Sequence, residues 1–259
     1  MTRAMTAAQP VGLDTAPLVL QGRIMPASNA TFLGEIDGVS VVYKPVAGER
    51  PLWDFPDGTL AAREVAAFAV SEALGWNVVP HTFLRDGPHG PGMVQVWQEP
   101  DPSLDPVDLV APGVVLEGWL HVLDAIGADD EPVALVHEDS AALRRMALFD
   151  VVVNNADRKG GHVLAMTDGH RYGVDHGVTF HTDPKLRTVL WGWTGRTLDD
   201  DESSAVAALA ADDALAGRLR ELLTRREIDA FRRRCERLAA AGRFPRPSSE
   251  WPAIPWPAF

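Results

Sequence analysis

Three short apolar runs near the start of the chain predict β-strands. They cover residues 18–24, 31–36 and 39–44. The last two runs are joined by Asp37-Gly38, and an Asp-Gly pair between apolar runs is a strong hairpin signal. The spacing therefore predicts an antiparallel sheet at the N-terminal end.

A helical period follows the strands. Thr59 can cap a helix over residues 60–74, and Gly75 can end it. Two further strands are predicted over 78–84 and 93–98, separated by a turn rich in Gly and Pro. The first part of the chain is thus expected to be β-rich with one helix.

The second part begins with a change in composition. Residues 99–118 are rich in Pro and Asp and 127–139 are acidic, and we interpret the first stretch as a link between two lobes. The remaining elements are a helix over 141–153, a hairpin over 162–175, a long loop over 178–200, and helices over 202–240 with a possible break at Gly217. This order lacks the βαβ alternation of a parallel sheet. It predicts an α+β protein with a β-rich N-lobe over 1–98 and a mainly helical C-lobe over 99–259.

Composition and charge narrow the functional classes. The 259-residue chain is 46% apolar, so it can bury a core, and its formal net charge is −12. A negative surface repels nucleic acid and anionic lipid at long range, so we expect no nucleic-acid partner. The single Cys235 excludes a disulfide within the chain and a multi-cysteine zinc site. No apolar run approaches the ~18 residues needed to span a bilayer, and no secretory signal is apparent, which predicts a cytoplasmic protein without a membrane span.

Four polar positions in otherwise apolar surroundings suggest phosphoryl transfer. Lys44 ends an apolar strand, Glu64 lies on the predicted helix, Asp157 lies in a Gly-rich turn after a helix, and Asp175 follows a strand and precedes His176-Gly177. Phosphoryl transfer depends on positioning and charge neutralisation. A lysine, a glutamate that orients it, and two carboxylates provide both.

The ordered motifs resemble the phosphatidylinositol 3/4-kinase-like branch of the kinase superfamily, above all type II phosphatidylinositol 4-kinases and small bacterial proteins grouped with them. The matching motifs are Val42-Tyr43-Lys44-Pro45, Arg63-Glu64-Val65-Ala66-Ala67-Phe68, Asp157-Arg158 and Val174-Asp175-His176-Gly177. The resemblance implies a bilobal protein-kinase-like fold that binds ATP with Mg²⁺ or Mn²⁺. It also implies transfer of phosphate to a hydroxyl group of a small molecule, a protein or an inositol-containing acceptor.

The resemblance assigns a role to each matched residue. Lys44, positioned by Glu64, would bind the ATP phosphates, and Asp157 would orient the acceptor hydroxyl and take its proton. Asp175 would hold the metal. His162 stands where the family has a metal-binding Asn, and imidazole suits Mn²⁺ better than Mg²⁺.

Further contacts are expected around this centre. Ser28 and Thr31 lie at the position of the family's phosphate-covering turn, and Val96, Trp97 and Gln98 at the adenine-binding hinge. The acceptor would be contacted by the cations Arg158, Lys159, Lys185 and Arg187. Transfer of AMP instead of phosphate and a non-catalytic nucleotide-binding scaffold remain open alternatives. The role of the Trp- and Pro-rich tail, the acceptor and the oligomeric state are not predicted.

Overall fold

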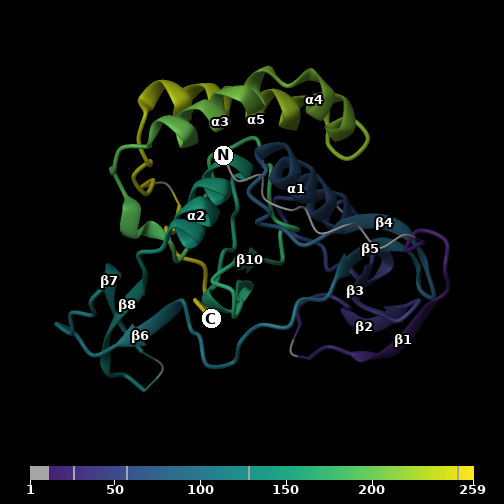
Figure 1. Cartoon of the computed structure of the whole chain (residues 1–259), viewed down its shortest axis with the longest axis horizontal. Coiled ribbons are helices and arrows are strands. Elements are labelled where there is room, and N and C mark those ends of the chain that lie inside the picture. The colour runs from purple at the N-terminus through teal and green to yellow at the C-terminus, as the bar shows by residue number, and fades with distance from the viewer. Residues whose placement is uncertain (1–11, 26, 57, 128, 250) are drawn as a thin grey trace. The chain divides into compact units, whose positions relative to one another are not determined.

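The computed structural model describes residues 12–25, 27–56, 58–127, 129–249 and 251–259 (Figure 1). It combines antiparallel sheets with helices, so the α+β class is confirmed. The chain forms two compact units. Unit 1 contains the residues up to Ala61 and His81–Trp97, whereas unit 2 contains Ala62–Pro80 and Gln98–Phe259. Most of the first long helix thus belongs with the C-terminal part of the chain.

Unit 1 is built on a five-stranded antiparallel sheet in the order β1-β2-β3-β5-β4. The strands are β1 (Leu18–Arg23), β2 (Phe32–Ile36), β3 (Val39–Pro45), β4 (Thr82–Gly87) and β5 (Gly90–Val96), and a 3-10 turn (Val46–Gly48) follows β3. Asp37 and Gly38 both have positive φ, 49° and 79°, as a two-residue type I′ hairpin requires. The β4–β5 turn is shorter than predicted, because pairing continues to Gly87 and Gly90.

The central strand β3 places alternate residues on opposite faces of the sheet. Val41 and Tyr43 are fully buried in a small core with Ile36 and Val94. Lys44 points to the other face, is half-buried, and lies opposite Met93 of β5. The predicted phosphate-binding lysine is therefore held near the end of the most central strand.

Unit 2 has a larger core that helices surround. The helices are α1 (Leu60–Leu74), α2 (Ala141–Val153), α3 (Asp200–Ala211), α4 (Asp213–Leu219) and α5 (Arg225–Ala241). In Figure 1, α3 and α5 lie side by side. Capping boxes begin both of them, Asp199 with Glu202 and Thr224 with Glu227. The predicted break at Gly217 was wrong, since this glycine lies inside α4 and the breaks come at Asp212 and after Leu219.

The interpretation of residues 99–118 as a link between lobes missed a strand, and no element was predicted over residues 119–139. The region contains a three-stranded antiparallel sheet in the order β6-β8-β7, formed by β6 (Val107–Val110), β7 (Trp119–Ile126) and β8 (Pro132–Glu138). Its central strand buries Ala134, Leu135 and Val136. The many Pro and Asp residues of this region lie in the turns around the strands. Because of these residues, the apolar run of β8 was not predicted as a strand.

A short hairpin completes unit 2. It consists of β9 (Val163–Ala165) and β10 (Arg171–Gly173), preceded by a 3-10 turn (Gly160–His162), with another 3-10 turn at Trp191–Trp193. Arg171 forms a bidentate ion pair with Glu138 of β8, with both distances 2.9 Å. Of the helices in the described ranges, none has both the length and the apolar character needed to cross a membrane.

Candidate active site

The loop after α2 begins with an asparagine in a left-handed conformation. Asn154 has φ 56° and ends the helix. Its side-chain amide donates to the carbonyl groups of His181 and Asp183, at 3.0 and 2.7 Å, and its Oδ1 accepts from the Lys185 N–H. The start of the predicted catalytic loop is therefore tied to residues 181–185, a link that sequence reasoning did not find.

The next residue fixes the backbone of Asp157. The Asn155 side chain donates to Asp150 of α2 at 2.9 Å, and its Oδ1 accepts from the Asp157 N–H at 3.0 Å. Such Asx turns hold a loop by local hydrogen bonds. The position of Asp157 thus depends on a buried acid that precedes it by seven residues.

Arg158 lies at the centre of this arrangement and is fully buried. Its Nε and Nη2 donate to the carboxylate of Asp150, both at 3.0 Å, and its Nη1 donates to the carbonyl groups of His162 and Val174 at 3.0 Å each. Nη2 also donates to Nε2 of His176. One guanidinium therefore joins the loop after α2 to the segment around Asp175. The expected contact of Arg158 with an acceptor is corrected to a positioning role, because solvent cannot reach the side chain.

His162 links the backbone of Asp157, the predicted base, to the side chain of Asp175, the predicted metal ligand. Its Nδ1–H donates to the backbone carbonyl of Asp157 at 3.0 Å, and its Nε2 lies 3.4 Å from Oδ2 of Asp175. With Nδ1–H donating to a carbonyl group, Nε2 faces Asp175 as a donor when the ring is protonated and as a lone pair when the ring is neutral. A histidine that donates its other N–H to a carbonyl group is the usual second-shell arrangement of a metal ligand. Asp175 has φ 61° and a side chain that is 48% exposed, so its carboxylate can also meet a ligand.

The carboxyl group of Asp157 is partly withdrawn from water. Burial, above all, raises its pKa to about 6, and the charge of Asp175 adds to the rise, whereas Lys159 and Arg187 oppose it. Lys159 Nζ lies 3.7 Å from the carboxylate. The pKa of Asp157 leaves it mostly ionised near neutral pH but more basic than an ordinary aspartate.

Arg187 carries a feature that suggests a ligand. Its Nε is buried, and no atom of the residues described in the structure forms a hydrogen bond with it. A buried donor without an acceptor costs free energy. Solvent does not reach this atom, so an oxygen of a bound phosphate or acceptor beside Asp157 would satisfy the donor only after the side chain moves.

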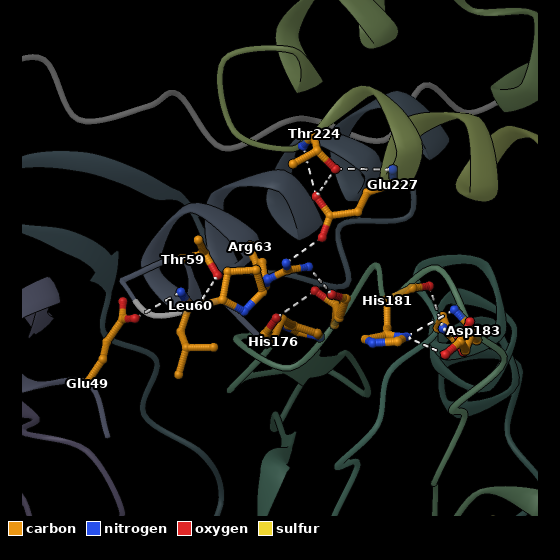
Figure 2. Close-up of polar contacts among 12 residues, drawn as sticks. Glu49, Thr59, Leu60, Arg63, His176, His181, Asp183, Thr224 and Glu227 are labelled. Carbon is orange, nitrogen blue, oxygen red and sulfur yellow. Dashed lines mark hydrogen bonds and ion pairs between the residues drawn. The ribbon is translucent and has the colours of Figure 1, made fainter. Parts of the chain in front are cut away.

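Glu64 contacts the predicted metal-binding segment directly. Its carboxylate is buried and accepts from the N–H of His176 at 2.8 Å. The neighbouring Arg63 donates to the carbonyl group of Thr179 at 2.7 Å and pairs with Glu227 of α5, which in turn accepts from Thr224 (Figure 2). The first turns of α1 therefore hold the chain just after Asp175. The expected pair between Glu64 and Lys44 would join the two units and stays a prediction.

The candidates in unit 1 lie in two places. Ser28 is exposed, whereas Thr31 is buried and its hydroxyl donates to the Asn29 carbonyl group at 3.3 Å. The N–H groups of Val96 and Trp97 donate to the carbonyl groups of His81 and Ser40. Both predicted hinge donors are thus already used within unit 1. Contacts of Ser28 and Thr31 with phosphate, and of Gln98 with adenine, stay predictions.

The C-terminal tail packs onto the loop that contains Asp157. The carbonyl group of Ala258 accepts from the Gly160 N–H, and the Phe259 ring fills the space that a Cβ atom on Gly160 would need. Lys185 is 2% exposed, and its ammonium lies 4.5 Å from the centre of the Trp251 ring. A direct contact of Lys185 with an acceptor, as expected from the sequence, would require the tail to move.

The residues present fit a divalent cation that also binds a nucleotide. No cluster of three or more His, Cys, Asp or Glu side chains suited to a metal occurs within the described ranges. The protein supplies two donors, Asp175 and His162. Mg²⁺ in nucleotide sites is usually held by one or two carboxylates together with substrate phosphates and water. This donor set therefore suits a cation that arrives with ATP.

Comparisons with known proteins give one close relative. No family model matches the chain, so the expected membership of the phosphatidylinositol 3/4-kinase-like family is not confirmed. A crystal structure of a proinflammatory kinase of Helicobacter pylori, CtkA, is 10% identical in sequence, and the match covers 89% of this chain and 94% of that chain. Its TM-score of 0.48 is too low to support an assignment. Protein Rv2133c of Mycobacterium tuberculosis is 52% identical and covers 95% of this chain and 94% of its own. The chain belongs to the same family as Rv2133c.

Proposed function

We propose that this protein is an ATP- and divalent-metal-dependent phosphotransferase that acts on a hydroxyl group, as the phosphatidylinositol 3/4-kinase-like motifs suggest. The observation that carries the proposal is the convergence of Asp157, His162 and Asp175. The His162 ring contacts the backbone carbonyl group of Asp157 at 3.0 Å and the carboxylate of Asp175 at 3.4 Å. A carboxylate with raised pKa next to a metal-binding pair is the arrangement that phosphoryl transfer uses.

Each residue of the centre then has a chemical role. Asp175 and His162 bind the cation, which neutralises charge on the phosphates when it is present. Lys44 binds the phosphates of ATP, and Arg187 supplies positive charge near Asp157 for a phosphate or acceptor oxygen. Glu64 fixes the backbone beside Asp175 through the His176 N–H.

Asp157 acts on the acceptor. Its ionised carboxylate accepts a hydrogen bond from the attacking hydroxyl group and takes the proton as the oxygen bonds to the γ-phosphorus. The bond from that phosphorus to the bridging oxygen breaks, and ADP leaves with the electron pair. A pKa near 6 suits this task, since a base works best when its pKa lies close to the working pH. Proton transfer of this kind contributes about 10²–10⁴-fold to a rate.

The test of this function begins with binding. Melting of the wild type is followed with ATP plus Mg²⁺ or Mn²⁺, and compared with Asp175→Ala. Asp229→Ala is the matched control, because its side chain is 49% exposed, against 48% for Asp175. ATP at about 100 times its dissociation constant should stabilise the wild type and the control by about 2.7 kcal/mol. Absence of a metal-dependent shift in the wild type would contradict the proposal.

The second step separates the enzyme from its alternatives. Mass spectrometry of acceptor pools incubated with ATP and Mn²⁺ distinguishes added phosphate from added AMP. Binding of ATP without any transfer would support the non-catalytic scaffold. Phosphate transfer that is lost in Asp157→Asn, while ATP binding is kept, is the result that the phosphotransferase proposal predicts.

A further inference from the structure

A pocket of unit 2 is lined by four arginines. The pocket has a volume of about 380 Å³ and lies between the C-terminal half of α5 and the segment that follows it. The basic residues are Arg234, Arg237, Arg243 and Arg246, and the apolar lining includes Leu238 and Phe244. None of these six residues belongs to the candidate active site.

The positive charge of the pocket is not neutralised by neighbouring acids. In the described parts of the chain, none of the four arginines forms an ion pair with a carboxylate. Arg234 donates instead to two backbone carbonyl groups, those of Val152 and His181, at 3.0 Å each. Burial lowers the pKa of Arg234 to about 10, and the charge of Arg237 contributes. Four guanidinium groups so placed favour an anion.

This concentration of positive charge runs against the charge of the whole protein. The formal net charge is −12, so arginines elsewhere would be expected to lie among acids, as Arg144 and Arg171 do. The net charge also disfavours an anionic membrane surface as the partner. A small soluble anion can enter the pocket without bringing two extended negative surfaces together.

The apolar part of the pocket indicates that the ligand also has an apolar portion. Leu238 and Phe244 are 5% and 4% exposed, and Phe244 packs against Trp193. These side chains form a fixed apolar wall. Small-molecule sites are usually apolar cavities of about 300–1,000 Å³ with a few polar groups that orient the ligand. Arginine matches phosphate geometrically because it donates two parallel hydrogen bonds.

We propose that this pocket binds a small soluble organic phosphate, whose phosphate group is held by the arginines and whose apolar body rests against Leu238 and Phe244. The proposal is independent of the phosphotransferase function, since it uses other residues and requires neither nucleotide nor metal.

The test is titration calorimetry with 1-naphthyl phosphate, inorganic phosphate and naphthol, in EDTA so that no metal is bound. The wild type should bind one 1-naphthyl phosphate per chain, at least tenfold more tightly than either half of the molecule. Arg237→Glu/Arg243→Glu should lose at least tenfold in affinity. The control Arg225→Glu/Arg233→Glu makes the same charge change at two exposed positions of α5 and should bind as the wild type does.

Several results would overturn the proposal. They are the absence of saturable binding by the wild type, equal affinity for inorganic phosphate, unchanged binding in the double variant, and binding only to vesicles of phosphatidylglycerol and phosphatidylcholine. Arg246→Glu, at an exposed position outside the helix, provides a second test if the double variant does not fold. The Arg246→Glu variant should bind 1-naphthyl phosphate more weakly than the wild type and keep the same melting temperature.

Discussion

Removing the Arg158 guanidinium should destabilise unit 2 more than almost any other single change. In Arg158→Leu, the Asp150 carboxylate stays fully buried without its cation, and the carbonyl groups of His162 and Val174 lose a donor. Breaking a buried ion pair by removing one partner costs about 3–5 kcal/mol. A protein of this size has a total stability of about 5–15 kcal/mol, so the loss is a large fraction.

The double variant Asp150→Leu/Arg158→Leu separates the charge from the hydrogen bonds. It removes both buried charges, and apolar pairs often replace buried ion pairs at little cost. We therefore expect the double variant to lose less free energy of unfolding than the two single variants together. The His162 carbonyl group keeps its bond from the Val174 N–H, whereas the Val174 carbonyl group loses the donor Arg158, which should still cost about 1–3 kcal/mol.

Urea denaturation followed by tryptophan fluorescence measures these free energies of unfolding. Arg225→Leu is the control, because its side chain is 94% exposed and a surface change of this kind should stay within about 0.5 kcal/mol. A loss below about 1 kcal/mol in Arg158→Leu would refute the reasoning. Additive losses in the double variant would show that Asp150 and Arg158 do not act as a pair.

Three further predictions follow from the same structure. Burial raises the pKa of Asp157 from 3.8 to about 6, so folding favours its protonated form. The stability that this protonated form contributes is lost as the pH rises from about 4 through 6. Asp157→Asn should therefore melt at a higher temperature than the wild type at pH 7 but not at pH 4. Gly160→Ala should displace Phe259, which limited proteolysis would detect as faster cleavage of the tail, whereas Gly161→Ala should not, because its Cβ would meet nothing within 4 Å. Arg63→Met should lower the stability of unit 2 by several kcal/mol in urea denaturation, because Glu227 would remain buried without its cation, and unchanged stability would count against this pair.

The sequence predicted those helices and hairpins that have a long apolar period or a specific turn sequence. The helices over about 60–74 and 141–153 lie where they were predicted, because their apolar period is long and Gly75 follows the first of them. The Asp37-Gly38 hairpin was equally clear. The sheet of β6, β7 and β8 was missed, because its strands are short and lie between Pro- and Asp-rich turns.

The site was predicted less completely than the helices. Sequence motifs selected Asp157, His162 and Asp175, which the structure brings together. They could not show that Arg158 is buried, since this depends on Asp150. In the sequence, Asp150 is a single acid in the apolar end of a predicted helix. Its role can be recognised only when its ion pair with Arg158 is known. Packing of the tail on Gly160 depends on tertiary contacts that no local pattern records.

The most direct test of the central claim is a crystal structure with Mn²⁺ and a non-hydrolysable ATP analogue. The anomalous signal of Mn²⁺ locates the cation without ambiguity. We predict that the cation lies between the Asp175 carboxylate, Nε2 of His162 and the analogue's phosphates, with the Lys44 amine contacting the same phosphates. A cation bound elsewhere, or a nucleotide that contacts neither Asp175 nor Lys44, would contradict the account.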